Sequence, residues 1–407
     1  MKDSTRFKET EIGMIPEDWE VRKLGTLGEV RTGKGTKILI SGKYQIIGSN
    51  GLLGYTDDYL EDKDLIYTGR VGTIGKINYQ KRDKIWLSDN VLYFTTNNLN
   101  LLKFIYYFLR KINFSYLNVG STQPLVKQSD FKELKLAIPK NKNEQSTIVK
   151  ILSSLDDKIE LNRKMNKTLE EIGQAIFKHW FVDFEFPNEQ GKPYKSSGGE
   201  MVYNEELGKE IPKGWKWGAL SDLIEEKRIK IGNRKAQVLS AIKTGELMHS
   251  EDFFTKKVYS INISKYLEVN RFDFAYNPAR INIGSIGLLK KNILGAVSPV
   301  YVVFSCKNNS HYFIEKMLKQ NSIKNQIIQF CSGTVRQILD FGGFKRIRLL
   351  IPSEDLFTTY NYFYEKLLSY QEFIKKEIDT LSQIRDLLLP KLMSGKIRVP
   401  LEEKDND

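Results

Sequence analysis

The chain has 407 residues, with 63 lysines and arginines against 50 aspartates and glutamates, so its net charge is +13. This length allows two or three domains, and the excess of positive charge favours a polyanionic partner, because cationic side chains displace the counterions condensed on phosphates. The two cysteines, Cys306 and Cys331, have no CxxC spacing, so the sequence supports neither a zinc ribbon nor a disulfide framework.

The sequence also bears on the meaning of the charge and on where the protein is located. A basic charge kept only for solubility is the simpler alternative to a polyanionic partner. The N-terminus leads into no apolar signal core, and no stretch approaches the ~18 apolar residues of a membrane helix. We therefore expect a soluble protein in the reducing cytoplasm, with no membrane partner.

The sequence contains one long internal repeat. The phrase at 15–19, Ile-Pro-Glu-Asp-Trp, returns at 211–215 as Ile-Pro-Lys-Gly-Trp, and the phrase ending at Pro139 returns ending at Pro352. The tryptophans are 196 residues apart and the prolines 213, so the second copy is 17 residues longer. A unit of nearly 200 residues can bury its own core, unlike a short solenoid repeat. The repeat therefore predicts two tandem modules.

The first module is predicted to span residues 1–140 and to mix strands with a helix. Short runs rich in Val, Ile, Tyr and Phe, such as 84–87 and 90–94, are bounded by turn residues and favour strands. Residues 101–109 form an aromatic helical stretch, and its counterpart is 312–318. Core packing is the expected role of both stretches, in preference to stacking on bases.

Helical periodicity begins after Pro139 and extends through the region 141–186. Apolar residues fall on alternating steps of three and four once Asn162, Asn166 and Gly173 are accepted in the series, which predicts a heptad seam. A buried Asn weakens packing but can fix register and choice of partner helix. The apolar seam positions in this region are Ile148, Leu152, Leu155, Ile159, Leu169 and Ile176.

A linker rich in Gly, Ser and Pro is expected at 187–210, before the second module at 211–353. A second helical region follows at 354–398, where only Glu377 interrupts the seam, and a polar tail at 399–407. An ordinary amphipathic helix lying on its own module is the alternative for each helical region. The second seam consists of Leu367, Tyr370, Ile374, Leu381, Ile384 and Leu388.

Connectivity predicts how the two helices are used. The first helix starts at module one and leads to module two, and the second helix starts at module two. If the two helices pack along their seams with the modules at opposite ends, the helices must run antiparallel. The expected fold class is therefore α+β: two tandem mixed α/β modules separated by two long antiparallel helices that form a coiled coil, with approximate two-fold symmetry. Duplex DNA has such an axis too, and a helix from 144 to 178 would span about 50 Å at ~1.5 Å per residue, more than the roughly 34 Å of one duplex turn.

Catalytic signatures are missing from the sequence. The three histidines, His179, His249 and His311, are scattered, and there is no H-E-x-x-H motif or Cys and His cluster for a metal. The phrase 277–280, Asn-Pro-Ala-Arg, lacks the second proline and the aromatic residue of an adenine methyltransferase motif. The glycine-rich turn 69–75 lacks Walker spacing. We expect no catalytic residue, metal or cofactor in this chain.

Two segments that occur in both copies are the candidate DNA contacts. One is the glycine turn at 69–75 and 282–287, and the other is the polar segment at 120–123 and 333–337, just before the closing strand. Arg and Gln can read guanine and adenine edges, while Ser and Thr can contact phosphates; ordinary turn chemistry is the alternative for both segments. The candidates are Arg70, Thr73, Ser121, Thr122, Gln123, Arg280, Ser285, Thr334, Arg336 and Gln337.

Taken together, these phrases resemble the specificity subunit of type I restriction-modification enzymes. The resemblance runs from about Glu11 to Val399. It rests on the Ile-Pro-x-x-Trp phrase at 15–19, the helix end at 169–184, the phrase from 206 to 215 and the helix end Leu-Leu-Leu-Pro-Lys-Leu-Met-Ser-Gly-Lys at 387–396. In combination these phrases are highly specific, although each alone is weak.

The resemblance implies a division of labour. Two target recognition domains would each read half of a split, asymmetric sequence in double-stranded DNA, and the helices would act as a ruler that also docks two methyltransferase subunits. Those partners would carry out adenine N6-methylation with S-adenosylmethionine, while optional motor and nuclease subunits would use ATP and Mg²⁺. The expected location is the cytoplasm of a bacterium or archaeon.

Two other classes of function remain as alternatives to a DNA-reading scaffold. One is a stand-alone DNA-modifying or DNA-cleaving enzyme with an unrecognised site, which would show turnover without partner subunits. The other is a coiled-coil interaction protein without a nucleic-acid role. It would show absent or salt-independent duplex binding when its partners are present.

Overall fold

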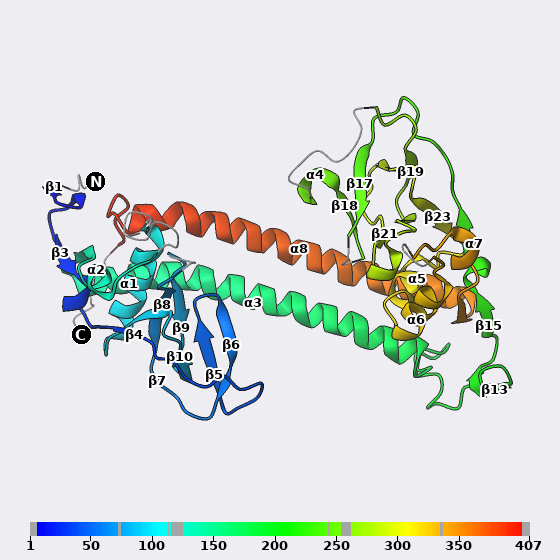
Figure 1. Cartoon of the computed structure of the whole chain (residues 1–407), viewed down its shortest axis with the longest axis horizontal. Helices are drawn as coiled ribbons and strands as arrows, with labels where there is room; N and C mark the ends of the chain where they lie inside the picture. The colour runs from blue at the N-terminus through cyan, green and yellow to red at the C-terminus, as the bar shows by residue number, and fades with distance from the viewer. Residues whose placement is uncertain are drawn as a thin grey trace. The chain divides into compact units, whose positions relative to one another are not determined.

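A computed structural model describes residues 6–71, 75–112, 114, 125–242, 245–253, 262–333 and 337–400 (Figure 1). The fold is mixed α/β, with two sheet-rich domains and two long helices. The chain divides into two compact units: residues 1–165 with 374–407, and residues 166–373. Each unit therefore holds one sheet-rich domain and part of each long helix.

Unit one contains two four-stranded sheets and two short strand pairs. The first sheet has the order β6 (Gly51–Thr56), β5 (Tyr44–Gly48), β10 (Lys84–Leu87) and β7 (Glu61–Asp62). The second has the order β4 (Glu29–Thr32), β11 (Val91–Thr95), β8 (Leu65–Gly69) and β9 (Asn78–Gln80). The pairs are β1 (Phe7–Thr10) with β2 (Gly13–Pro16), and β3 (Trp19–Lys23) with β12 (Lys135–Pro139). Helices α1 (Leu99–Lys111) and α2 (Gln128–Lys132) precede β12.

Unit two repeats this arrangement. One sheet has the order β18 (Leu247–His249), β17 (Gln237–Ala241), β22 (Gly295–Val297) and β19 (Leu267–Val269), and the other β16 (Ile224–Glu226), β23 (Val302–Cys306), β20 (Phe274–Tyr276) and β21 (Ile286–Leu288). The pairs are β13 (Met201–Asn204) with β14 (Lys209–Pro212), and β15 (Lys216–Ala219) with β24 (Arg348–Ile351). The helices are α4 (Ser250–Phe253), α5 (His311–Met317), α6 (Asn321–Phe330) and α7 (Phe341–Phe344).

Strand directions match between the units as well. The pair β5–β10 is parallel and so is its counterpart β17–β22, whereas the other named strand pairs are antiparallel. The phrases repeated in the sequence therefore mark one strand topology used twice. In both copies the strand at the closing proline pairs with a strand at or next to the repeated tryptophan: β12, which ends at Pro139, pairs with β3, and β24, which ends one residue before Pro352, pairs with β15.

The two long helices are α3 (Lys142–Phe181) and α8 (Glu354–Leu392). In unit one, Arg385 Nη1 donates to Asp156 Oδ1 at 2.9 Å, and Asn162 Nδ2 donates to Glu377 Oε2 at 2.9 Å. Rising numbers on α3 thus meet falling numbers on α8, so the helices run in opposite directions there.

Unit two shows the same order of contacts along its parts of the helices. Gln371 Nε2 donates to the Asn166 carbonyl at 3.3 Å, and the rings of Phe177 and Tyr360 are centred 6.1 Å apart. A Cβ at Gly173 would lie 3.4 Å from the Tyr364 ring, which is ordinary contact. The helices therefore also run in opposite directions within unit two.

Most predicted seam residues are buried or half-buried, but two are exposed to solvent. Tyr370 is 65% exposed and Ile384 is 41% exposed, so the expectation is wrong at these two positions. Their neighbours Gln371 and Arg385 donate hydrogen bonds to α3 instead. The seam was assigned from apolar residues only, whereas polar residues face α3 at these two places. Ile148, Leu152, Ile159, Leu367 and Ile374 are buried, and Leu155, Leu169, Ile176, Leu381 and Leu388 are half-buried.

The helix ends join the domain cores. In unit one, Leu152 of α3 and Leu392 of α8 belong to the hydrophobic cluster that contains Trp19 and Phe104. In unit two, Phe181 at the end of α3 and Phe357 near the start of α8 share a cluster with Trp215 and other core residues. Within each unit, the helix ends therefore pack into the core of the sheet-rich domain.

Candidate nucleic-acid interface

In module one, described residues that flank the two candidate segments pair with each other. The turn that follows β8 begins at Arg70, whose carbonyl accepts a hydrogen bond from the Val126 N–H at 3.0 Å. An isolated bridge joins Val71 to Leu125. Arg70 and Val71, at the start of the turn, are therefore adjacent to Leu125 and Val126, although the chain separates the two pairs by more than 50 residues. Thr73, Ser121, Thr122 and Gln123 lie outside the described residues.

Module two brings together the corresponding segments with an equivalent bond. The Leu339 N–H donates to the Pro278 carbonyl at 3.1 Å. Val126 and Leu339 both stand 13 residues before their closing prolines, so this backbone bond is part of the repeat. A side-chain bond joins the segments too, since Asn282 Nδ2 donates to Gln337 Oε1 at 3.1 Å. In module two this pairing forms a composite polar edge, and in module one only Arg70, Val71, Leu125 and Val126 of the corresponding region are described.

Individual candidates differ in how free they are. Arg280 and Gln337 are exposed, and no carboxylate of a described residue pairs with Arg280. Ser285 is only 7% exposed and donates its hydroxyl to the Ala241 carbonyl at 3.1 Å. Its hydroxyl is therefore committed to holding the turn against β17. Thr334 and Arg336 lie outside the described residues.

Arg70 has an unusual environment among the described residues. Its Nε is buried and has no hydrogen-bond partner there, although its side chain as a whole is half-buried. A buried donor without a partner among the described residues costs free energy. Asn282 was not among the predicted contacts, although it is the first residue of the predicted glycine turn 282–287.

Several other basic side chains in unit two are neutralised internally. Lys227 Nζ lies 2.6 Å from Asp273 Oδ2, and Arg234 Nη2 lies 2.5 Å from Glu268 Oε2. Burial alone would raise the pKa of Glu268, but hydrogen bonds from Arg234 and Asn270 lower it below its ordinary value. These cations stabilise the domain and have little charge left for a phosphate.

The described residues include no group of three or more His, Cys, Asp or Glu that could hold a metal ion. His311 is buried against Phe272, with ring centroids 4.0 Å apart, and burial followed by the nearby Arg271 charge lowers its pKa to about 4. A neutral histidine packed in this way serves the core. Within the same described part, no helix is long and apolar enough to cross a membrane.

Comparisons with known proteins identify the family. Residues 16–171 match the type I restriction modification DNA specificity domain. The type I restriction enzyme MjaIX specificity subunit of Methanocaldococcus jannaschii is 31% identical over 97% of each chain, and the HindI specificity subunit of Haemophilus influenzae is 28% identical over 68% of this chain and 72% of its own. The crystal structure of a type I restriction-modification S subunit from M. genitalium has a similar fold, with a TM-score of 0.60, 19% identity and coverage of 92% of this chain and 96% of that one. The chain belongs to the family of type I restriction-modification specificity subunits.

Proposed function

We propose that this chain is the sequence-specific DNA recognition subunit of a type I restriction-modification complex and performs no catalysis itself. The observation that carries this proposal is the family match over nearly the whole chain, in a protein whose module topology occurs twice. Two copies of one reader suit a bipartite target, and the net charge of +13 suits a phosphate backbone. Each module, 1–140 and 211–353, is a target recognition domain for one half-site.

The helices supply the geometry in this proposal. As an antiparallel coiled coil with approximate two-fold symmetry, α3 and α8 hold the two domains at a fixed separation. A 40-residue helix is about 60 Å long at ~1.5 Å per residue, so its length sets the spacing between half-sites. The same helices dock two methyltransferase subunits, which supply the methylation chemistry with S-adenosylmethionine.

The composite polar edge of module two and the corresponding region of module one are the proposed reading surfaces. Arg280 and Gln337 are exposed at this edge in module two, and the half-buried Arg70 begins the corresponding turn in module one. Bidentate side chains of these types discriminate bases by about 1–3 kcal/mol each. A backbone bond next to each candidate region recurs in both modules, from Val126 to Arg70 and from Leu339 to Pro278.

Selection from a randomised duplex library tests the function. The full chain, assembled with its methyltransferase partner, should select two conserved half-sites separated by a spacer of constant length and free sequence. Methylation or cleavage by the chain alone, supplied with S-adenosylmethionine or Mg²⁺, would favour a stand-alone enzyme instead. Failure of the assembled complex to bind any duplex would favour a pure interaction protein.

A substitution tests the reading surface. Arg336→Ala should cost about 1–3 kcal/mol on the selected duplex and relax one base position, if this side chain reads a base. Repeating the library selection with the variant measures both effects. An unchanged motif and affinity would remove Arg336 from the surface while leaving the function itself in place.

A further inference from the structure

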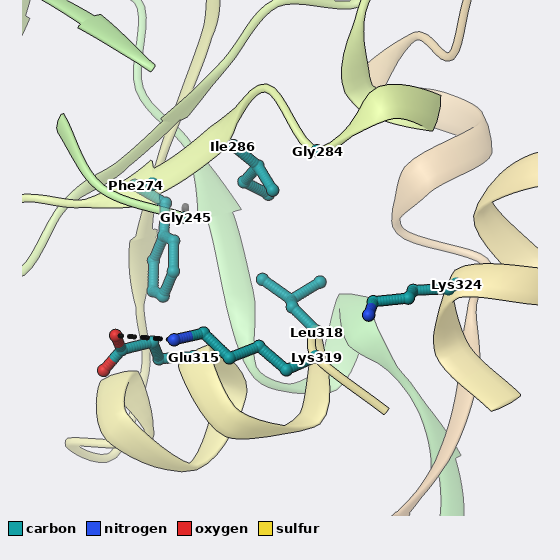
Figure 2. Close-up of a pocket in the computed structure, with 9 residues that line it drawn as sticks. Gly245, Phe274, Gly284, Ile286, Glu315, Leu318, Lys319 and Lys324 are labelled. Atoms are coloured by element: carbon teal, nitrogen blue, oxygen red, sulfur yellow. Dashed lines mark ion pairs between the residues drawn. The ribbon is translucent and has the colours of Figure 1, made fainter. Parts of the chain in front are cut away.

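A cavity lies behind the glycine turn of module two. It has a volume of about 300 Å³ and is bounded by the hairpin residue Gly245, by the turn and strand residues Gly284 to Gly287, and by Leu318, Lys319 and Lys324. Figure 2 shows the Lys324 side chain extending from α6 toward Leu318, and Lys319 directed toward Glu315. Two lysines therefore stand beside the turn that carries the candidate base contacts.

Local structure fixes both lysines in this place. Lys319 directly follows α5 and Leu318, and its N–H donates to the Lys316 carbonyl at 3.2 Å. Lys324 lies in the first turn of α6, and α6 packs against the 3₁₀ turn η4 (Ile281–Ile283) that contains Asn282. The lysines and the polar edge thus adjoin the same backbone segment.

The charge around the cavity is strongly positive. The one carboxylate in its wall is Glu315, which pairs with Lys290 at 2.7 Å and is 4.0 Å from Lys319. No carboxylate of a described residue pairs with Lys324, which is exposed. One negative charge therefore faces three lysines, and the unneutralised charge belongs mainly to Lys319 and Lys324.

We propose that Lys319 and Lys324 form a phosphate seat for the DNA backbone beside the reading edge of module two. Two properties suit a backbone phosphate. First, the ammonium groups are exposed beside a turn whose glycines carry no side chains, so a DNA backbone could approach it closely. Second, contacts that position a protein on phosphates commonly flank the side chains that read bases. Glu315 acts as a positioning residue, because its ion pairs orient Lys290 and Lys319.

The contrast with module one supports the seat. Arg110, near the end of α1, occupies the comparable place after the aromatic helical stretch, but its Nη1 lies 3.2 Å from Asp156 Oδ2. That guanidinium is engaged in holding α1 against α3. Asp156 is shared with Arg385 as Glu315 is shared with Lys290, but the Arg110 pair is shorter than the 4.0 Å between Lys319 and Glu315, so the cation of module two is the less tightly held of the two.

The experiment uses the full chain assembled with its methyltransferase partner and rests on the proposed function. For the wild type and for the double variant Lys319→Ala with Lys324→Ala, the affinity for the selected duplex is measured between 50 and 200 mM salt, that is, over roughly the range in which counterion release is resolved. The slope of log affinity against log salt should become shallower by roughly 1.8, about 0.9 for each lost phosphate contact, while the selected motif stays the same.

Matched variants separate the position of charge from its amount. Lys192→Ala with Lys195→Ala, in the exposed linker, removes the same charge and should leave the slope unchanged. Lys319→Arg with Lys324→Arg should keep the wild-type slope. The proposal is overturned if the double alanine variant keeps the wild-type salt dependence of affinity. It is also overturned if the linker variant reduces that salt dependence by the same amount.

Two further readouts identify the ligand and isolate a failure of the function. Acylation of lysines should be blocked at Lys319 and Lys324 by the duplex but not by inorganic phosphate at equal ionic strength. Equal protection by inorganic phosphate would indicate a small-anion site and overturn the proposal. Absence of duplex binding by the wild-type complex would defeat the proposed function, whereas binding with an unchanged slope in the double variant defeats only the seat.

Discussion

The tryptophans of the repeated phrase, Trp19 and Trp215, are both buried but have chemically opposite surroundings. Trp19 donates its indole N–H to Glu144 Oε2 at 3.3 Å, and Arg398 donates to the other oxygen of that carboxylate at 2.9 Å. Trp215 instead packs on aromatic rings: Phe186 is stacked on it with centroids 5.4 Å apart, and Phe184 meets it edge-on at 5.3 Å.

One position of the repeat also differs in chemical character between the two clusters. Glu144 and Phe357 each stand five residues after the closing proline, and both are buried. The repeat thus preserves burial at this position while exchanging an ion-paired network for an aromatic cluster. At this position unit one therefore has hydrogen bonds between segments far apart in the chain, whereas unit two has buried aromatic area.

Replacing the residue at this position by alanine should lower the free energy of unfolding more than any other change considered below. Glu144→Ala leaves Arg398 and the Trp19 N–H without their shared partner and should cost about 3–5 kcal/mol, as expected for breaking a buried pair. Phe357→Ala should cost a similar 3–5 kcal/mol through the cavity it leaves. Hydrogen exchange should show the first variant opening 15–23 selectively and the second opening 211–224. Equal opening of both segments by either variant would mean that the units are not separately stabilised.

Gly395 offers a more moderate test of unit one. Its φ of +68° is left-handed, and a Cβ there would lie 2.2 Å from Pro16 Cγ. Gly395→Ala should therefore cost at least about 2 kcal/mol, measured from the urea midpoint. Gly191→Ala in unit two is the control: its φ is +72° with nothing within 4 Å, so it should cost only about 1 kcal/mol of backbone strain. Equal losses would show that the Pro16 contact is unimportant.

Lys316 in unit two should give the smallest effect, and in the opposite direction. Burial lowers its pKa to about 8, although Glu315 opposes the shift, and its ammonium lies 4.6 Å from the centre of the Tyr364 ring. The unfolded chain then binds more protons between pH 8 and 10.5, so wild-type stability should rise with pH across that window. Lys316→Met should remove this rise and add about 1 kcal/mol at pH 7, after allowance for the lost cation–π contact. Urea midpoints at pH 7 and 9.5 measure both; an unchanged pH slope contradicts the prediction.

Local signals in the sequence were sufficient to predict the two long helices and the duplication. Heptad spacing predicted the region of α3 and α8, because apolar periodicity reflects burial directly. It failed at Tyr370 and Ile384, since polar side chains such as Arg385 take the positions that bond to α3. A pattern built on apolar residues cannot register such polar contacts.

Pairings between distant segments could not be read from the sequence. The mixed strand order, with parallel β5–β10 beside antiparallel neighbours, depends on tertiary packing that no short motif encodes. The bond from Val126 to Arg70 and the ion pair from Arg398 to Asp18 join residues with no local signal of their partnership. For the candidate site, the two segments were identifiable one by one, but their adjacency came only from the structure.

The discontinuity of unit one also affects how the protein is made. Its core includes Leu389, Leu392, Met393 and Val399, whereas unit two is a single continuous stretch, 166–373. During translation at roughly 5–20 residues per second, the apolar surface around Trp19 must wait roughly 10–50 s after residue 165 before these last residues are synthesised. Unit two can close earlier, so the domain that is translated first should complete its folding last, and during that interval the nascent chain is most exposed to aggregation.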